Sequence, residues 1–207
     1  MRAVLKAEEK ERQRIAADLH DNLGAFAAAI SSNVDHISAS QKDITELKVY
    51  EELKANSQSM VSQLNDTIWV LTKEILALTA ISDRLKVFIQ RLHNSYPSIQ
   101  TDVTEKINSD HLLAPIQAFH LFNILQEAII NALKHSRGSQ ILITIESDDN
   151  WSIIVADNGN GFQPNERTGN GLINMKNRTK EAGWTINWEP NVPQGIKLII
   201  HSNQHPA

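Results

Sequence analysis

Glycine and proline are unevenly distributed along this chain, and their placement limits the possible fold more than any other feature of the sequence. All 6 prolines and all but one of the 8 glycines lie from Pro97 onward, and the exception is Gly24. Because these residues interrupt helices and strands, long helices are expected before Pro97 and shorter elements joined by turns after it. A chain of 207 residues has room for two modest domains.

Apolar residues in the first part recur at steps of three and four, the spacing of one face of a helix. One stripe predicts a helix over residues 3–40, and a second stripe, from Ile44 to Ile75, predicts a partner helix that runs back. A hairpin of two antiparallel helices has too little apolar surface to close a core, so we expect it to dimerise into a four-helix bundle. This first domain is assigned to residues 1–78.

Residues 79–207 are expected to form an α/β sandwich with a mixed sheet and helices on one face. Thr79 to Ser82 is interpreted as a linker before a helix that stops ahead of Pro97. Gly138 and Gly183 are expected to end the two later helices. Those helices are predicted at 115–136 and 172–182, and strands at 98–104, 141–147, 151–156, 185–189 and 196–201.

Composition excludes several classes of protein. The net charge of -4 and a pI near 6.1 argue against nucleic-acid binding, which needs a clustered basic surface. The absence of cysteine fits a reducing compartment. No apolar run is long enough to span a membrane, and the N-terminus is too charged for a signal peptide. We therefore expect a cytoplasmic protein, with any membrane contact made through an upstream sensor region.

The helix predicted at 115–136 places polar side chains on one face. At about 100° per residue, Glu127, Asn131 and Lys134 align, with apolar residues opposite. Such a face is often only solvated. The chemical alternative is a nucleotide site, because an Asn carbonyl oxygen suits Mg²⁺. Glu127 would hold a water or act as a base there, and Lys134 and His135 would meet phosphates.

A glycine-containing turn directly follows the strand predicted at 151–156. Asp157 can accept a hydrogen bond from an exocyclic amine such as that of adenine. Gly159 and Gly161 would let the backbone pass close to a flat ring. The alternative is an ordinary hairpin or bulge turn, in which such residues are common.

A second glycine pair, Gly169 and Gly171, precedes Leu172 and the last predicted helix. Glycines before a helix expose its N-terminal amides and the positive end of its dipole to a phosphate. The alternative is a tight loop without a ligand. The order of the three segments is more specific than any one of them.

The segments EAIINALKHS (127–136), DNGNGF (157–162) and GNGLINMKNR (169–178) resemble the N box and two glycine boxes of the GHKL ATPase superfamily. Gyrase, the ninety-kilodalton heat-shock chaperone and histidine kinases belong to it. The resemblance implies a Bergerat-type sandwich in which Asn131 binds Mg²⁺ and Asp157 binds the adenine amino group of ATP. It also implies that Gly169 and Gly171 lie in a mobile segment over the phosphates. Only residues 163–168 separate Phe162 from Gly169, so any lid over the nucleotide is short. We therefore expect weak nucleotide retention.

The segment ERQRIAADLHDNLG (11–24) resembles the dimerisation and phosphoacceptor helix of histidine kinases related to bacterial nitrate and membrane-fluidity sensors. LNDTIWVLTKE (64–74) is similar to a stretch that many of these kinases carry. The resemblance implies that His20 attacks the γ-phosphate of ATP and that Asp21 takes or orients the proton on the other ring nitrogen. His20 falls at the edge of the apolar stripe of its predicted helix, where its side chain is accessible to a nucleotide.

Two positions depart from the family pattern. Where these kinases often have Gln five residues after the His, this chain has Ala25, and we predict weak phosphatase activity toward the regulator. The last strand begins with Gly195 and Ile196 in place of Gly-Thr, which removes a hydroxyl near the base. Reduced nucleotide affinity or base selectivity is expected from this change.

These features predict a homodimeric sensor histidine kinase core that uses ATP and Mg²⁺ to phosphorylate His20. The phosphoryl group would pass to an Asp in the receiver domain of a response regulator. Two alternatives stay open at this point: a GHKL-type serine kinase or ATPase, and a non-catalytic dimeric signalling scaffold. An acid-labile, alkali-stable phosphoryl label on the protein would distinguish the histidine kinase interpretation from both alternatives.

Overall fold

The computed structural model describes residues 61–62, 64–70, 72–93, 95–161 and 170–202, together with single helical positions at 30, 53 and 57. The chain divides into two compact units, Met1–Glu74 and Ile75–Ala207. In the first unit the described residues up to position 70 are helical. The rest of the predicted hairpin and its dimer contacts lie outside the described residues. Residues 73–75 are not helical, so the expectation that the second helix continues to Ile75 is wrong.

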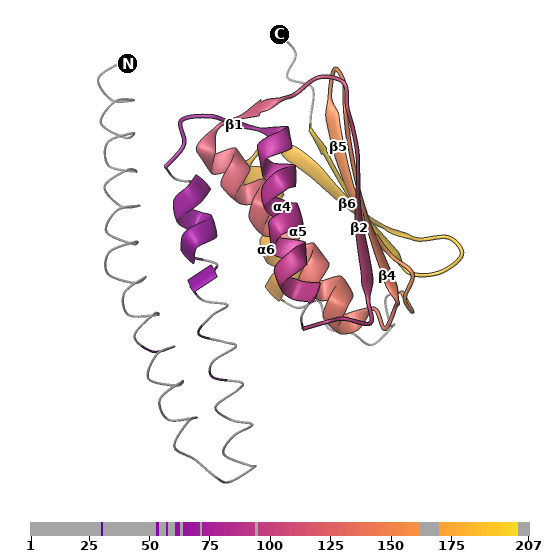
Figure 1. Ribbon diagram of the computed structural model, residues 1–207. Coiled ribbons are helices and arrows are strands. Elements are labelled where there is room, and N and C mark those ends of the chain that lie inside the picture. The colour runs from indigo at the N-terminus through magenta and orange to yellow at the C-terminus, as the bar shows by residue number, and fades with distance from the viewer. Residues whose placement is uncertain are drawn as a thin grey trace. The chain divides into compact units, whose positions relative to one another are not determined.

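The second unit is built on a five-stranded sheet with the order β2-β4-β5-β7-β6 (Figure 1). Strand β2 runs parallel to β4, and the other neighbours in this sheet are antiparallel, which confirms the predicted mixed sheet. Each predicted strand is present, with ends shifted by a few residues. The bounds are β2 Gln100–Ile107, β4 Gln140–Ser147, β5 Trp151–Asp157, β6 Trp184–Pro190 and β7 Ile196–Ser202.

Three helices, α4 (Leu78–His93), α5 (Pro115–His135) and α6 (Asn170–Glu181), lie on one face of this sheet (Figure 1). Alternate strand residues point toward the helices, as period-two patterning requires. The core between helices and sheet is apolar. Its fully buried side chains include Leu85, Leu121, Phe122, Leu125, Ile129, Ile143, Ile153 and Ile200. The predicted sandwich with helices on one face is therefore confirmed for this unit.

The ends of the helices show which local rules hold. Pro115 is in the first turn of α5, where its missing N–H costs no hydrogen bond. Helix α5 ends shortly before Gly138, as expected, but the residue that leaves it in the left-handed region is Arg137, with φ 55°. A glycine is needed at position 138 because a Cβ there would lie 2.6 Å from Asn158 Oδ1. After α6, Gly183 has φ 78°, as expected for a helix exit.

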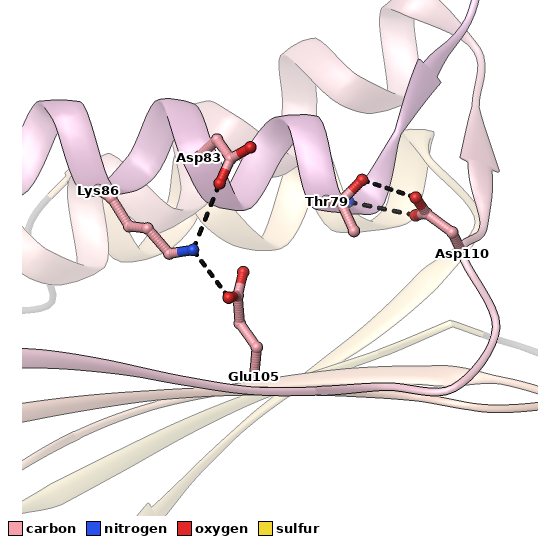
Figure 2. Close-up of polar contacts among 5 residues, drawn as sticks. All are labelled: Thr79, Asp83, Lys86, Glu105 and Asp110. Atoms are coloured by element: carbon pink, nitrogen blue, oxygen red, sulfur yellow. Dashed lines mark hydrogen bonds and ion pairs between the residues drawn. The ribbon is translucent and has the colours of Figure 1, made fainter.

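Helix α4 begins at Leu78, so the interpretation of Thr79 to Ser82 as a linker is wrong. Leu78 and Ile81 are 0% and 1% exposed, respectively. The helix start is capped from a distance: Asp110 accepts hydrogen bonds from the Thr79 amide at 3.2 Å and from the Thr79 hydroxyl at 2.6 Å (Figure 2). A carboxylate at a helix N-terminus also interacts favourably with the helix dipole. Because this cap lies 31 residues away, local sequence gives no sign of it.

Two further contacts hold α4 in place. Strands β1 (Leu76–Ala77) and β3 (Leu112–Leu113) form a short antiparallel pair just before the helix. Farther along, the Lys86 ammonium lies 2.7 Å from Glu105 on β2 and 3.3 Å from Asp83 (Figure 2). The hydrogen bond to Lys86 lowers the pKa of Glu105, and the reciprocal bond raises the pKa of Lys86.

Among the described residues, no helix has the length and apolar character needed to cross a membrane.

Candidate nucleotide site

A cavity of about 330 Å³ lies between α5, the sheet and α6. One wall is the polar face of α5, the floor is formed by β5, β7 and β6, and the far wall is the first half of α6. Its volume falls at the lower end of the range typical for small-molecule sites. It is lined by Glu127, Ala128, Asn131, Ala132, His135, Ser136, Val155, Asp157, Gly161, Gly171, Leu172, Met175, Trp188, Ile196 and Leu198.

The α5 wall presents Glu127 and Asn131, one helical turn apart. The Asn131 amide nitrogen donates to Glu127 Oε1 at 3.2 Å. This bond fixes the orientation of the amide and leaves its carbonyl oxygen, Oδ1, available to an electropositive group. On the opposite face of the helix, Ile129 and Leu133 are buried in the core. Core packing therefore orients the polar pair toward the cavity, as the helical period predicted.

The floor of the cavity ends at Asp157, the last residue of β5, which is only 6% exposed. Its Oδ1 accepts a hydrogen bond from the Gly159 amide at 2.8 Å. Gly161 lines the cavity with φ 75°, a conformation that favours glycine. Gly159 does not line the cavity. It lies so close to Ser136 that a Cβ would overlap the Ser136 backbone.

The Asp157 turn is tied to the end of α5 through Asn158 and Ser136. Asn158 Oδ1 accepts hydrogen bonds from the amides of Ser139 and Gln140, both at 2.9 Å. The Asn160 amide donates to the Ser136 carbonyl at 2.8 Å. These bonds fix the spacing between the α5 wall and the turn that begins at Asp157, so Asn131 and Asp157 belong to one rigid arrangement.

The α6 wall begins with Gly171 and Leu172, which both line the cavity. A Cβ at Gly171 would overlap Glu127 Oε1 and lie 3.5 Å from Asn131 Nδ2. The absence of a side chain at this position lets the start of α6 approach the α5 wall. The predicted partners Gly169, His20 and Asp21, as well as Ala25, lie outside the described residues.

Two basic residues predicted to meet phosphates differ in position. His135 lines the cavity at the end of α5. Lys134 is exposed and is not among the lining residues. Both occupy the last turn of the helix, where cations are favoured by the helix dipole.

Several lining residues were not singled out from the sequence. Val155 and Leu198 form the apolar floor, Met175 covers it from α6, and Trp188 lines it from β6. Ile196, which the sequence analysis did single out, also lines the floor. The Lys176 ammonium lies 5.3 Å from the centre of a Trp188 ring, a cation–π distance. Alternation along β5 and β7 identifies such residues as facing the helices, but it does not show that a cavity separates them from the helices.

Helices α5 and α6 are also in contact away from the cavity, at His120. Its Nε2 lies 3.3 Å from Glu181 Oε2, and the side chain is buried. Burial lowers the pKa of His120, and this effect outweighs the opposing influence of the Glu181 carboxylate. The lowered pKa disfavours the charged imidazole, so the contact with Glu181 is not a strong ion pair near pH 7.

The donor set fits a hard divalent cation bound together with phosphate. Mg²⁺ prefers oxygen ligands, takes few of them from protein, and completes its shell with water and phosphate oxygens. The Asn131 carbonyl oxygen could serve as such a ligand, because the Glu127 contact uses the amide nitrogen and leaves this oxygen available. Gly171, at the N-terminal end of α6, lies beside this pair, and a helix N-terminus is a favourable place for a phosphate.

Comparison with known proteins agrees with this geometry. Residues 117–205 match the family described as histidine kinase-, DNA gyrase B-, and HSP90-like ATPase. This match covers all three segments singled out in the second domain.

Solved structures share the fold at low sequence identity. The histidine kinase domain of a blue-light activated histidine kinase from Erythrobacter litoralis EL346 is 12% identical, with a TM-score of 0.54 over 84% of this chain and 94% of that chain. Acinetobacter baumannii histidine kinase AdeS is 17% identical, with a TM-score of 0.53 over 84% and 93%. Full-length ShkA in complex with AMPPNP is 15% identical, with a TM-score of 0.55 over 91% of this chain and 45% of that chain. Residues 117–205 are therefore similar to the ATPase domain of the histidine kinase-, DNA gyrase B- and HSP90-like family, and the chain shares its fold with solved histidine kinase structures.

Proposed function

We propose that this chain is the catalytic core of a sensor histidine kinase, which uses ATP and Mg²⁺ to phosphorylate His20. The observation that carries the proposal is that Glu127, Asn131, Asp157 and Gly171 line the same cavity, within the segment that matches the ATPase family. The crystal structure of a relative of similar fold, ShkA, was obtained with AMPPNP, an ATP analogue.

The base end of ATP is assigned to the floor of the cavity. Asp157 keeps Oδ1 for the Gly159 amide, and its other carboxylate oxygen accepts the exocyclic amine of adenine. Val155 and Leu198 provide the apolar surface beneath the ring. Gly161 keeps the backbone close to the base without a side chain in the way.

The phosphate end is assigned to α5 and the start of α6. Asn131 Oδ1 would hold Mg²⁺, which offsets charge on the phosphates. Glu127 holds the Asn131 amide in orientation, and it also lies where it can bind a water or accept a proton. His135 meets the phosphates from the α5 wall, and Lys134 approaches them from outside the cavity. Residues 169–172 are assigned to the segment over the phosphates. Gly159 does not touch the nucleotide in this assignment, but it lets the Asp157 turn pack against Ser136.

Phosphoryl transfer is assigned to His20 and Asp21 in the helical domain of residues 1–78. A ring nitrogen of His20 forms the new N–P bond as the bond from the γ-phosphorus to the bridging oxygen breaks and ADP leaves. Asp21 takes or orients the proton on the other ring nitrogen. The phosphoryl group then passes to an Asp of a receiver domain, and the helical domain acts as a homodimer.

Radiolabelled ATP tests this proposal. The protein is incubated with Mg²⁺ and ATP labelled at the γ-phosphate, and His20→Gln is treated in parallel, with His36→Gln as a matched control on the same predicted helix. We expect label that is lost in acid, survives alkali and is absent only from His20→Gln. Acid-stable label would assign the chain to the serine kinases instead, and nucleotide binding without label would make it a signalling scaffold.

A further inference from the structure

The turn that begins at Asp157 is held from a second side by the loop between β6 and β7. The Asn191 side-chain amide donates to the Asp157 carbonyl at 2.8 Å, and the Gln194 side-chain amide donates to the Asn158 carbonyl at 2.9 Å. The loop itself is closed by a hydrogen bond from the Asn191 backbone amide to the Gly195 backbone carbonyl at 3.0 Å. Two amide side chains from one closed loop therefore hold consecutive carbonyls of the turn.

The Asp157 carbonyl lies just beyond the pairing between β5 and β7, although Asp157 is still opposite Ile141 of β4. Pairing between β5 and β7 ends at Ala156 and Lys197, one residue short of Asp157. A buried carbonyl without a partner is unfavourable, so a donor is needed at this point. The Asn191 side-chain amide supplies this donor.

The same loop also limits the space around the Asp157 carboxylate. Gly195 has φ 108°, and a Cβ there would overlap the Asp157 carbonyl and lie 2.9 Å from Oδ1. With Oδ1 bound to the Gly159 amide and Gly195 packed beside it, the carboxylate has little freedom. The position of its other oxygen therefore depends on the β6–β7 loop.

We propose that Asn191 is a positioning residue for Asp157 and thereby sets the preference of the site for adenine over guanine. This inference rests on the proposed nucleotide site and extends it. Adenine presents an amine to a carboxylate where guanine presents a carbonyl oxygen, so an Asp that is held in place favours adenine and opposes guanine. An Asp that moves discriminates less. Gln194 forms a second, more exposed hydrogen bond with the same turn.

The test compares Asn191→Ala and the isosteric Asn191→Asp, which keeps the shape but loses the donor. Asn187→Ala, an exposed position on β6, is the matched control. Calorimetry measures ATP and GTP binding to each. We expect ATP affinity to fall roughly tenfold in both Asn191 variants, about the value of one buried hydrogen bond. GTP affinity should fall less or rise, so the ATP-to-GTP ratio decreases, whereas the control keeps the wild-type ratio.

A second measurement does not need nucleotide. Hydrogen exchange at the Gly159 amide, which bonds Asp157 Oδ1, should be faster in nucleotide-free Asn191→Ala than in wild type, and unchanged in Asn187→Ala. If wild type binds no ATP, the proposed function fails, and the exchange result alone then decides whether Asn191 positions Asp157. Unchanged exchange, or equal losses of ATP and GTP affinity, would overturn the inference.

Discussion

Gly171, at the start of α6, lies against the carboxylate of Glu127 on α5, so that a methyl group added to this glycine would overlap Glu127 Oε1. The same carboxylate oxygen accepts the hydrogen bond from the Asn131 amide. The two helices therefore meet at the oxygen that orients the proposed metal ligand. Any side chain at position 171 has to displace this oxygen or move the start of α6.

We predict that Gly171→Ala weakens Mg²⁺-dependent ATP binding without unfolding the protein. The end of the Glu127 side chain can move away, but it then loses its hydrogen bond to Asn131. Loss of such a supporting contact costs roughly 10- to 100-fold in metal affinity or activity. Calorimetry with and without Mg²⁺ measures the effect, and Asn174→Ala, exposed on the same helix, is the control. Unchanged Mg²⁺-dependent affinity would show that Glu127 does not orient a metal ligand.

Two substitutions at Glu127 separate its two proposed roles. Glu127→Gln keeps an acceptor for the Asn131 amide but removes the base, so ATP affinity should persist while the phosphorylation rate falls. Glu127→Ala removes both, and ATP affinity should fall as well, by roughly 10-fold or more. Single-turnover phosphorylation and calorimetry on the same samples distinguish these outcomes. A normal rate in Glu127→Gln would eliminate the role as a base.

The distant cap on α4 predicts a contrast in stability between two polar contacts of Figure 2. Asp110→Ala leaves the Thr79 amide and hydroxyl without their acceptor and should cost about 1 kcal/mol, as the loss of a helix cap does. Lys86→Met removes an ion pair whose side chains are 38% and 31% exposed, and it should cost less than about 1 kcal/mol.

Urea unfolding of the chain measures both values. Asp149→Ala, exposed in the turn after β4, is a suitable control for a lost surface carboxylate. If Lys86→Met proves more destabilising than Asp110→Ala, the cap does not hold the start of α4.

Stability should fall as the pH drops below about 6.5, the ordinary pKa of His120. Burial lowers the pKa of this histidine in the folded state, so the unfolded chain binds a proton first on acidification, and proton binding then favours unfolding. The loss is complete once the pH is below the folded-state pKa. The Arg178 charge lowers the pKa of His120 further, and the Glu181 carboxylate raises it by less than burial lowers it.

The variant His120→Leu should show a weaker decline in unfolding free energy between pH 7.5 and pH 5.5 than wild type, while the control His201→Gln, exposed on β7, should retain the wild-type decline. Urea unfolding at the two pH values measures this. Parallel pH profiles for His120→Leu and wild type would contradict the assignment.

Much of the second unit follows from its sequence because strongly patterned segments decide their own structure. The β-branched runs of β4 and β5 and the amphipathic pattern of α5 are long enough to identify, and the structure has all three. Glu127 and Asn131 are one turn apart on a helix, so their common face was predictable. Their roles as catalytic and metal-binding residues stay predictions, as do those of His20 and Asp21.

The remaining features depend on contacts between distant parts of the chain. The two-residue strands β1 and β3 are too short for any periodicity, and the start of α4 is capped by Asp110 from the segment between β2 and β3. Arg137 adopts the left-handed conformation next to a glycine that would adopt it more easily. Gly138 is instead required by the close approach of Asn158, which only the folded chain reveals.

Trp188 gives the proposed site an optical signal of its own. It lines the cavity beside Lys176, whereas Trp151 and Trp184 pack edge to face at 4.8 Å and are buried. Indole emission responds to nearby charge and to aromatic groups, so a nucleotide in the cavity would change the fluorescence of Trp188 and leave that of the buried pair nearly constant. A Trp188→Phe variant would thus separate the spectrum of an occupied cavity from the spectrum of an intact fold.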